Sequence, residues 1–207
     1  MRRTPGSLLF LGGLLLATMS GWAQNVPLVS RVEQPNSVSS VANGASIVVN
    51  SPIGRTESLS VTLTYIGQGS STIRSAPALA GSPSFAIESA DATPAPLASG
   101  QTYRFSLRFT PQRSSLVSAQ VSFPFSESVT GGSGTTITVQ GFFALQFVGT
   151  APELVVSYIG ADAQSYMPVA AGGIIPFPAT SLGATSASLI SIANRGSGAG
   201  EVTSAAM

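Results

Sequence analysis

The chain has 207 residues, of which 43% are hydrophobic and 8% are charged, and it contains neither cysteine nor histidine. The chain has nine basic residues, all of them arginine, and eight carboxylates. This near-neutral balance lacks the excess of basic residues that is typical of a nucleic-acid-binding protein. The missing cysteines and histidines exclude disulfides, thiolate metal sites and histidine-based catalysis, and the apolar content is too high for a disordered chain.

The N-terminal segment has the three parts of an export signal. Arg2 and Arg3 precede an uncharged run of 12 residues from Leu8 to Met19, and Gly21 and Ala23 supply small residues for cleavage after Ala23. A membrane-spanning helix needs roughly 20 apolar residues, so the run is too short for an anchor. We therefore expect a signal peptide over residues 1–23, export by the general secretory route, and no stable membrane span after cleavage.

Strand patterns follow a polar leader, which we assign to residues 24–39. Ala45–Val49 is a short β-branched run, and apolar residues alternate with hydroxyl residues from Leu59 to Tyr65. Segments 71–75 and 85–89 are weaker candidates. The most regular alternation is "TYRFSLRF", where Tyr103–Phe109 places aromatic and aliphatic side chains on one face and arginines on the other.

Two further strands complete the first half of the chain. Alternation runs from Ala119 to Phe125, "GGSG" at residues 131–134 predicts a hairpin tip, and Ile137–Val139 returns from it. Seven short strands in about 100 residues, without a sustained helical period, predict an all-β immunoglobulin-like β-sandwich. We assign this sandwich to residues 40–150.

The early part of this pattern recurs later in the chain. "VTLTYIGQGSSTIRSA" at residues 61–76 aligns without a gap with "ISIANRGSGAGEVTSA" at residues 190–205, an offset of 129. The matches fall on inward apolar positions and turn glycines, as expected for a duplicated structural unit. The matched pairs are Gly44 with Gly173, Gly54 with Gly183, Thr56 with Thr185, Val61 with Ile190, Leu63 with Ile192, Gly67 with Gly196, and Gly69 with Gly198.

The second copy predicts an incomplete unit. Residues 151–207 contain no counterpart of the strands at 103–109, 119–125 and 137–139, which would supply much of the facing sheet. Ordering a chain costs about 1.5 kcal/mol per residue, and half a sandwich buries too little surface to offset that cost. We therefore expect residues 151–207 to form a truncated, marginally stable start of a second similar module, with an open sheet edge.

These motifs resemble the bacterial choice-of-anchor D repeats, which are similar to the Hydin-like or ASH immunoglobulin-like domains. The resemblance rests on turn and core residues over about 42–144 and at the start of the second copy; they are Gly54-Arg-Thr, Gly100, Phe109-Thr-Pro111, Ala119, Gly141, Gly183-Ala-Thr and Asn194-Arg-Gly196. Tyr65 departs from the pattern, which has an asparagine that bonds the turn backbone, so we expect a looser turn there. The resemblance implies non-catalytic modules in large exported bacterial proteins.

Several groups of residues raise chemical hypotheses, each with a plainer explanation. Gly196, Gly198 and Gly200 suggest a phosphate loop, but their spacing fits a hairpin turn better. Glu88 and Asp91 could mimic the carboxylate pair of a glycosidase, although loop carboxylates are the simpler interpretation. One carboxylate at Asp162 is too few for calcium, which takes six to eight oxygen ligands.

Two other groups raise the possibility of sugar binding. Arg104 and Arg108 share the outer face of one strand with Arg113 nearby, and could contact an anionic glycan; solvated charges that discourage edge aggregation are the alternative. Tyr158 and Tyr166 could stack on sugars, or pack at a module junction. The sequence predicts no catalytic residue, no cofactor and no metal site.

The sequence favours an exported, non-catalytic protein of the cell envelope or the medium. Its modules would serve as structural spacers or as adhesive, protein-binding surfaces, with other proteins or neighbouring repeats of a longer chain as partners. The alternative is a carbohydrate- or substrate-binding accessory module of a longer secreted enzyme. Neither hypothesis involves nucleic acid.

Overall fold

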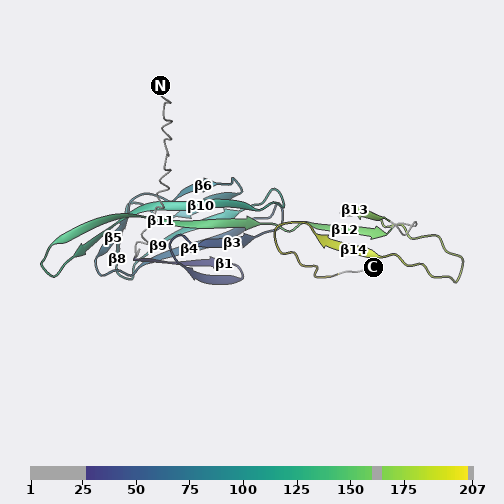
Figure 1. Cartoon of the computed structure of the whole chain (residues 1–207), viewed down its shortest axis with the longest axis horizontal. Helices are drawn as coiled ribbons and strands as arrows, with labels where there is room; N and C mark the ends of the chain where they lie inside the picture. The colour runs from purple at the N-terminus through teal and green to yellow at the C-terminus, as the bar shows by residue number, and fades with distance from the viewer. Residues whose placement is uncertain (1–26, 160–164, 205–207) are drawn as a thin grey trace, which may run out of the picture.

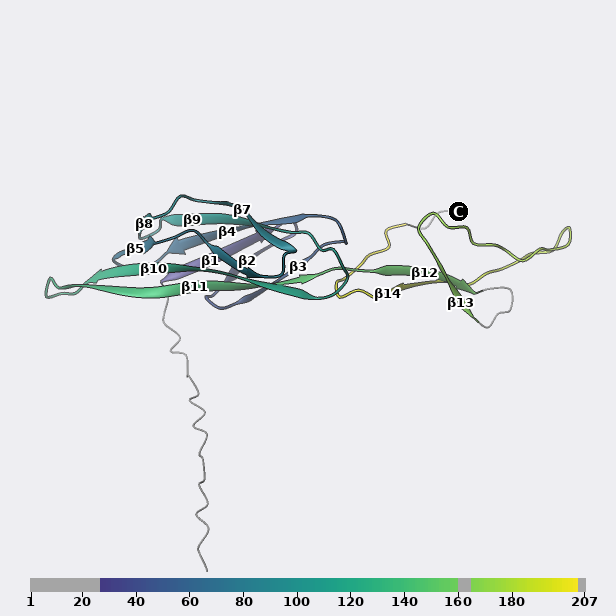
Figure 2. The same cartoon turned by 90° about the horizontal axis from the view of Figure 1, so that it is seen from above.

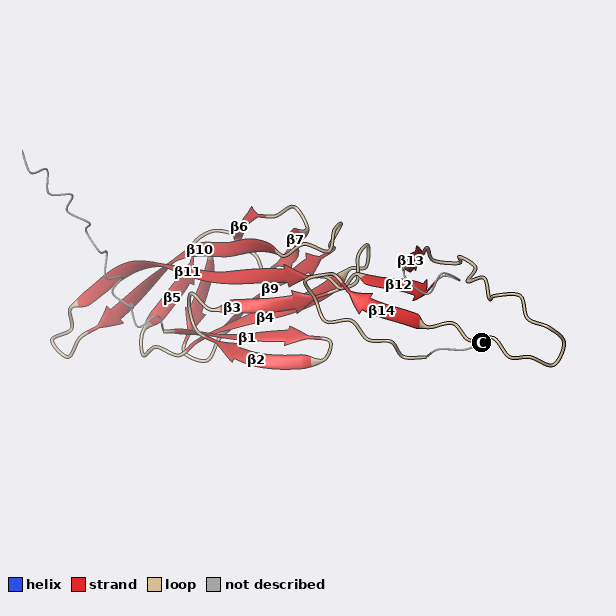
Figure 3. Ribbon diagram, turned by 45° about the vertical axis from the view of Figure 1, so that its right-hand side comes forward, coloured by secondary structure: helices blue, strands red, loops and turns tan. Residues whose placement is uncertain are grey.

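The computed structural model describes residues 27–159 and 165–204. The described residues form β-strands, turns and coil without a helix, which confirms the prediction of an all-β fold (Figure 3). In these ranges there is accordingly no helix long and apolar enough to cross a membrane. The predicted signal peptide and Asp162 lie outside the described residues.

The strands form three sheets, with the orders β2-β1-β4-β9-β7, β3-β11-β10-β5-β8 with β6 also paired to β10, and β13-β12-β14. Their bounds are β1 (Leu28–Gln34), β2 (Ser37–Val41), β3 (Ser46–Asn50), β4 (Glu57–Tyr65), β5 (Ser70–Ile73), β6 (Ala78–Gly81), β7 (Phe85–Ala90), β8 (Ala95–Ala98), β9 (Thr102–Phe109), β10 (Val117–Thr130), β11 (Thr136–Thr150), β12 (Leu154–Ile159), β13 (Tyr166–Val169) and β14 (Ile190–Asn194).

The first two sheets face each other across one apolar core and form a β-sandwich. The alternating apolar residues of β4 and β9 point inward and are at most 2% exposed, whereas Arg104 and Arg108 are exposed. Aromatic rings fill the centre: Phe85 stacks on Phe109 with centroids 4.6 Å apart, and Phe123 stacks on Phe143 at 5.4 Å. The predicted faces of the strand at 103–109 are therefore confirmed.

The hairpin of β10 and β11 is much longer than the sequence pattern indicates. Its strands pair from Val117↔Gly149 to Thr130↔Thr136, and residues 131–134 form the predicted tip, where Gly131 N–H donates to Thr135 C=O at 2.9 Å. Apolar alternation fades toward the tip because serines and threonines occupy both strands there, while the backbone ladder continues. The tip projects from one end of the sandwich (Figure 1).

The predicted leader is part of the sandwich. Strands β1 and β2 lie almost entirely within residues 24–39, and β1 pairs antiparallel with β4 along Leu28↔Tyr65 to Glu33↔Ser60. Leu28 is 3% exposed and Val32 is fully buried. The start of the sandwich at residue 40 is thus corrected: the sheet begins at Leu28.

The third sheet lies beyond the opposite end of the sandwich from the hairpin tip, so the two units follow one another along the longest axis of the molecule (Figures 1 and 2). Its strand β14 coincides with the strand expected at Ile190 and Ile192, and pairs with β12 from Leu154↔Asn194 to Tyr158↔Ile190. On the other side of β12, the short strand β13 pairs from Val156↔Val169 to Ile159↔Tyr166.

Candidate functional site

The third sheet repeats the arrangement of the first three strands of the sandwich. In β2-β1-β4 the central strand β1 pairs antiparallel with both neighbours, and β12 does the same in β13-β12-β14. The register is also kept, since every counterpart on β12 follows its β1 residue by 126 positions and every counterpart on β14 follows its β4 residue by 129. The equivalent cross-strand pairs are Leu28↔Tyr65 and Leu154↔Asn194, Ser30↔Leu63 and Val156↔Ile192, Val32↔Val61 and Tyr158↔Ile190, and Ser30↔Val41 and Val156↔Val169.

One of the matched turn glycines has the same backbone conformation in both copies. Gly54 has φ +75°, inside a turn closed by Arg55 N–H donating to Pro52 C=O at 3.0 Å. Gly183 has φ +83°, inside a turn closed by Ala184 N–H at 3.0 Å from Ser181 C=O. Only glycine adopts this conformation without strain, which explains the recurrence.

A second glycine match is displaced by one residue. Gly44 has φ +81° in the turn that Ala45 N–H closes on Ala42 C=O. In the second copy Gly173 N–H closes the turn on Ala170 C=O at 2.8 Å, and the positive φ, +76°, belongs to Gly172. The structural counterpart of Gly44 is therefore Gly172, and the offset between these two turns is 128 residues, one fewer than the offset of 129 at Gly54 and Gly183.

The turn after β14 is held by Asn194 in the way that an asparagine is expected to hold it. Its side-chain oxygen accepts hydrogen bonds from Gly196 N–H at 3.0 Å and from Glu153 N–H at 3.1 Å. Its side-chain amide donates to Gly198 C=O at 2.7 Å. One side chain thus ties the turn to the start of β12.

Tyr65 occupies the equivalent position in the first copy and anchors its turn differently. Its ring is fully buried, Gly67 lies against it, and its hydroxyl donates to the Glu127 carboxylate on β10 at 3.0 Å. Burial and the Glu127 carboxylate raise the pKa of Tyr65, partly opposed by a hydrogen bond from Gly69 N–H. The expectation of a looser turn is wrong, because the tyrosine joins the turn to the facing sheet.

The junction between the two units is built from close backbone contacts. Ala151 is fully buried; its C=O accepts from Gly198 N–H at 3.0 Å and its N–H donates to Ser197 Oγ at 3.2 Å. A Cβ on Gly198 would lie 2.0 Å from Asn50 Oδ1 and 2.9 Å from the Ala151 backbone. Glycine is therefore required at this position, because the two segments of the chain approach each other too closely for a side chain.

Side chains from the sandwich reinforce this junction. Asn50 at the end of β3 donates to Ala199 C=O at 2.9 Å and accepts from the Thr150 hydroxyl at 3.2 Å. Ser114 accepts from Ser197 N–H through its C=O at 2.9 Å, and its hydroxyl donates to Glu153 at 2.6 Å. Three separate segments of the sandwich thus hold the second unit.

One face of the third sheet remains largely uncovered. We call it the open face and define it by Leu154, Val156, Tyr158, Ile190 and Ile192, which share one side of the sheet by register. Their counterparts in the sandwich are at most 3% exposed, whereas Leu154, Ile190 and Ile192 are 43%, 44% and 46% exposed. The same apolar pattern therefore packs against a second sheet in one unit and meets solvent in the other.

The three glycines considered for a phosphate loop serve the junction instead. Gly196 and Gly198 leave no room for a side chain beside Ala151, and a Cβ on Gly200 would lie 3.0 Å from Pro152 Cβ and 3.1 Å from Leu154. They follow strand β14 and precede coil rather than a helix. Close packing accounts for all three.

Glu88 and Asp91 have separate structural partners. Glu88 sits at the bulge where the β7–β9 register shifts and accepts from Ser58 Oγ at 3.1 Å. Asp91 accepts from the Arg104 backbone N–H at 2.8 Å, and its own C=O accepts from the Tyr103 hydroxyl at 3.0 Å. In the part of the chain described, no cluster of three or more His, Cys, Asp or Glu residues could hold a metal ion.

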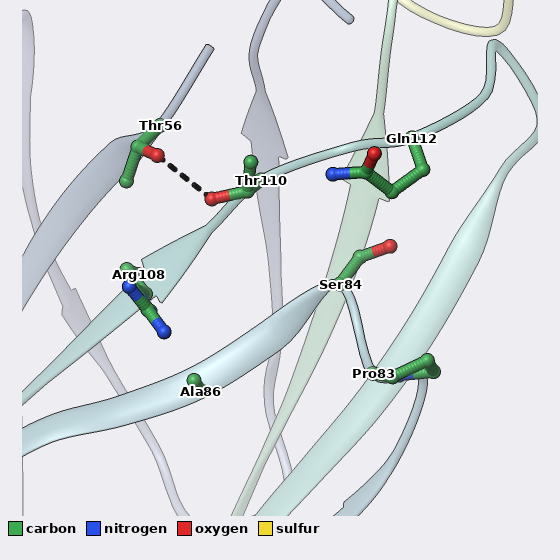
Figure 4. Close-up of a pocket in the computed structure, with 7 residues that line it drawn as sticks. All are labelled: Thr56, Pro83, Ser84, Ala86, Arg108, Thr110 and Gln112. Carbon is green, nitrogen blue, oxygen red and sulfur yellow. Dashed lines mark hydrogen bonds between the residues drawn. The ribbon is translucent and has the colours of Figure 1, made fainter. Parts of the chain in front are cut away.

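Arg108 lines a surface pocket of about 380 Å³, shown in Figure 4, but the three candidate arginines do not meet there. Arg104 and Arg113 are exposed elsewhere. A hydrogen bond of 2.8 Å joins Thr56 and Thr110 at the pocket, and Arg108 is the single charge among the residues that line it: Thr56, Pro83, Ser84, Ala86, Arg108, Thr110 and Gln112.

Tyr158 and Tyr166 lie on opposite faces of the third sheet. Tyr158 stands opposite Met167 and Ile190, whereas Tyr166 stands opposite Ile159, the neighbour of Tyr158. Side chains alternate faces along a strand, so the two rings cannot form one stacking platform. The Tyr158 hydroxyl donates to Met167 Sδ at 3.4 Å, and Tyr166 is 57% exposed.

No family model matches the chain, and no curated protein matches it. Among solved structures, the VesB protease of Vibrio cholerae is 16% identical with a TM-score of 0.37, over 51% of this chain and 31% of the protease chain. A FixG-related protein of Vibrio parahaemolyticus is 13% identical with a TM-score of 0.28, over 56% of this chain and 94% of that chain. Likenesses at this level carry no inference about fold or activity.

Proposed function

We propose that the protein is an exported, non-catalytic repeat protein, whose immunoglobulin-like modules of choice-of-anchor D type act as spacers and protein-binding surfaces. The observation behind this proposal is the recurrence of β2-β1-β4 as β13-β12-β14, with strand order, register and one turn glycine retained. Duplicated units joined end to end are typical of proteins that span distance and present surfaces to partners.

The junction supports the spacer role, because a spacer must keep its modules in a fixed relation. Ala151 is buried between the units, and Gly198, Ser197 and Asn50 bond across the joint. These contacts leave little free linker between Thr150 and Leu154. We therefore expect the second unit to move with the sandwich as one body.

Spin labelling tests this stiffness, and the absence of native cysteine makes labelling specific. Labels at Gln120→Cys on β10 and Ala193→Cys on β14, both exposed positions, should give one narrow distance distribution. Gly198→Val should broaden it, because the side chain would displace Asn50 and Ala151. The control is Gly132→Val at the hairpin tip, where a Cβ meets open space. A broad distribution in the unmodified junction would refute the spacer role.

Export is tested separately with the whole chain in a bacterial host. Cleavage after Ala23 should release a product that begins at Gln24, as read by N-terminal sequencing. A product that keeps Arg2, or that stays in the cytoplasm, would contradict the proposed location.

A further inference from the structure

The pocket beside Arg108 is a hollow in the surface of the sandwich (Figure 4). Three segments line it: the residue that precedes β4, the start of β7, and the end of β9 with the turn after it. Thr110 N–H donates to Ser84 C=O at 2.8 Å, which ties the last two segments together. On the core side of the same strands, the stacked rings of Phe85 and Phe109 are buried. Packed elements therefore hold the lining in place.

Arg108 brings to this pocket a positive charge that has no direct partner. Within the described residues, no salt bridge and no side-chain hydrogen bond involves its guanidinium. Glu88 accepts from Ser58, which stands opposite Arg108 on β4, but Glu88 does not line the pocket, and the lining contains no carboxylate. The guanidinium thus keeps its N–H donors available for a negatively charged ligand.

The neutral groups of the lining have spare hydrogen-bonding capacity. The hydroxyl oxygens of Thr56 and Thr110 are 2.8 Å apart, and one hydroxyl donates to the other. The accepting hydroxyl therefore retains its own hydrogen for a ligand. Gln112 adds an amide on the other side of Thr110 from Arg108, and Ser84 adds a further hydroxyl (Figure 4). A charge on one side, with alcohol and amide groups beside it, fits a ligand that combines a carboxylate with hydroxyl groups.

We propose that this pocket binds an acidic sugar, a hexuronic acid residue of a polysaccharide. Arg108 holds the sugar carboxylate through two parallel hydrogen bonds, because the planar guanidinium matches a carboxylate in shape and charge. Thr110 and Gln112 bond the ring hydroxyls. The volume of about 380 Å³ lies at the lower end of the range of small-molecule sites, about 300–1,000 Å³, and suits a small sugar. The inference goes beyond the proposed function, because it gives the sandwich a ligand of its own.

Three other kinds of ligand share only part of this chemistry. A neutral sugar offers hydroxyl groups but leaves the charge of Arg108 unpaired. An acidic peptide offers a carboxylate but lacks the ring hydroxyls that Thr110 and Gln112 would bond. A phosphate group carries about 1.5 to 2 negative charges at pH 7, more than the single arginine of the pocket balances. The acidic sugar uses both the charge and the neutral polar groups.

Titration of the whole, isotope-labelled chain with D-glucuronic acid, followed by NMR, tests the proposal. The signals to read are the side-chain Nε–H of Arg108 and the backbone amides of Ser84 and Thr110. D-glucose is the matched neutral probe, because an alcohol replaces the carboxylate, and it should bind at least tenfold more weakly. Acetate carries the carboxylate without the ring and should also bind at least tenfold more weakly.

Matched variants locate the contact. Arg108→Gln should weaken glucuronate binding at least tenfold, whereas Arg104→Gln changes the net charge equally, lies on the same strand outside the pocket, and should change binding by less than twofold. Thr110→Val should weaken glucuronate binding at least threefold and leave acetate binding within twofold, because Thr110 bonds the sugar ring. If Thr110→Val disturbs the fold, Gln112→Ala supplies the same comparison at an exposed position.

The proposal is overturned if glucuronate shifts none of these signals, if glucose or acetate binds as tightly, or if Arg104→Gln weakens binding as much as Arg108→Gln. Tighter binding of inorganic phosphate or of a blocked tetraglutamate peptide would also overturn it, because the ligand class would then be a different one. Failure of glucuronate to bind would leave the spacer role and export standing, since label distances and the mature N-terminus test those separately.

Discussion

Phe109 shows how one position on β9 carries stability while its neighbours do not. Its ring is fully buried, stacks on Phe85, and lies so close to Gly149 that a Cβ there would be 2.3 Å from it. Arg104 lies on the other face of the strand and is exposed. The alternation of apolar and charged residues along β9 thus places one set of side chains in the core and the other in solvent.

Phe109→Ala should lower the free energy of unfolding by about 3–5 kcal/mol, because it removes a buried ring and leaves a cavity. Arg104→Ala should change it by less than about 0.5 kcal/mol, because the side chain is solvated. Urea unfolding followed by circular dichroism measures both. Equal losses would mean that the two faces of β9 are assigned the wrong way round.

Two buried tyrosines make stability depend on pH at the alkaline end. Burial, with the Glu127 carboxylate, raises the pKa of Tyr65, and burial with the Asp91 carboxylate raises the pKa of Tyr103. Both groups must stay protonated in the fold, whereas in the unfolded chain they ionise near pH 10. Their stabilising contribution is therefore complete below about pH 10 and is lost as the pH rises beyond it.

The urea midpoint should accordingly hold steady near pH 8–9 and fall above about pH 10. Tyr65→Phe should flatten this fall, because it removes one of the two titrating groups, at the cost of the bond to Glu127. Unfolding curves at a series of pH values provide the measurement. A midpoint unchanged up to pH 11 would contradict the assignment of these hydroxyls to a dry environment.

Among the elements, the length and regularity of the apolar alternation separate the strands that the sequence located from one that it missed. β4 and β9 have unbroken alternation, so pattern alone located them. β1 carries a fully buried serine, Ser30, whose hydroxyl donates to Val41 C=O in β2. A serine at an inward position interrupts the apolar alternation in the sequence, and the neighbouring strand whose carbonyl accepts from its hydroxyl is not visible there.

Leu28→Ala tests whether β1 belongs to the sandwich. It should lower the free energy of unfolding by about 2–5 kcal/mol, because Leu28 packs in the core at 3% exposure. Val29→Ala is the control, since Val29 lies next to it, faces outward and is 40% exposed; its effect should stay within about 0.5 kcal/mol. Equal, small effects of the two substitutions would mean that residues 28–34 are a dispensable leader and do not stabilise the sandwich.

At the scale of the whole molecule, the repeat was visible in the sequence, but the junction was not. Matched glycines and apolar residues reveal a duplicated unit, because turns and cores constrain residue type. The contacts of Asn50, Ser114 and Ala151 with residues 197–199 join segments far apart in the chain, and nothing in their local sequence marks them as partners. The open face emerges from the same comparison, because its residues match positions that are buried in the sandwich.

One complete sandwich precedes a unit that is built on the same plan but left open. Residue-resolved native-state hydrogen exchange on the whole chain can distinguish the stability of the two units. Amides paired inside the sandwich, such as those of β4, β9 and the inner part of β10, should exchange only by global unfolding. Amides of β12 and β14 should exchange at least a hundredfold faster through local opening, because their apolar face lacks a second sheet. Equal protection in both units would show that the second unit is as stable as the sandwich and that its apolar face is not open.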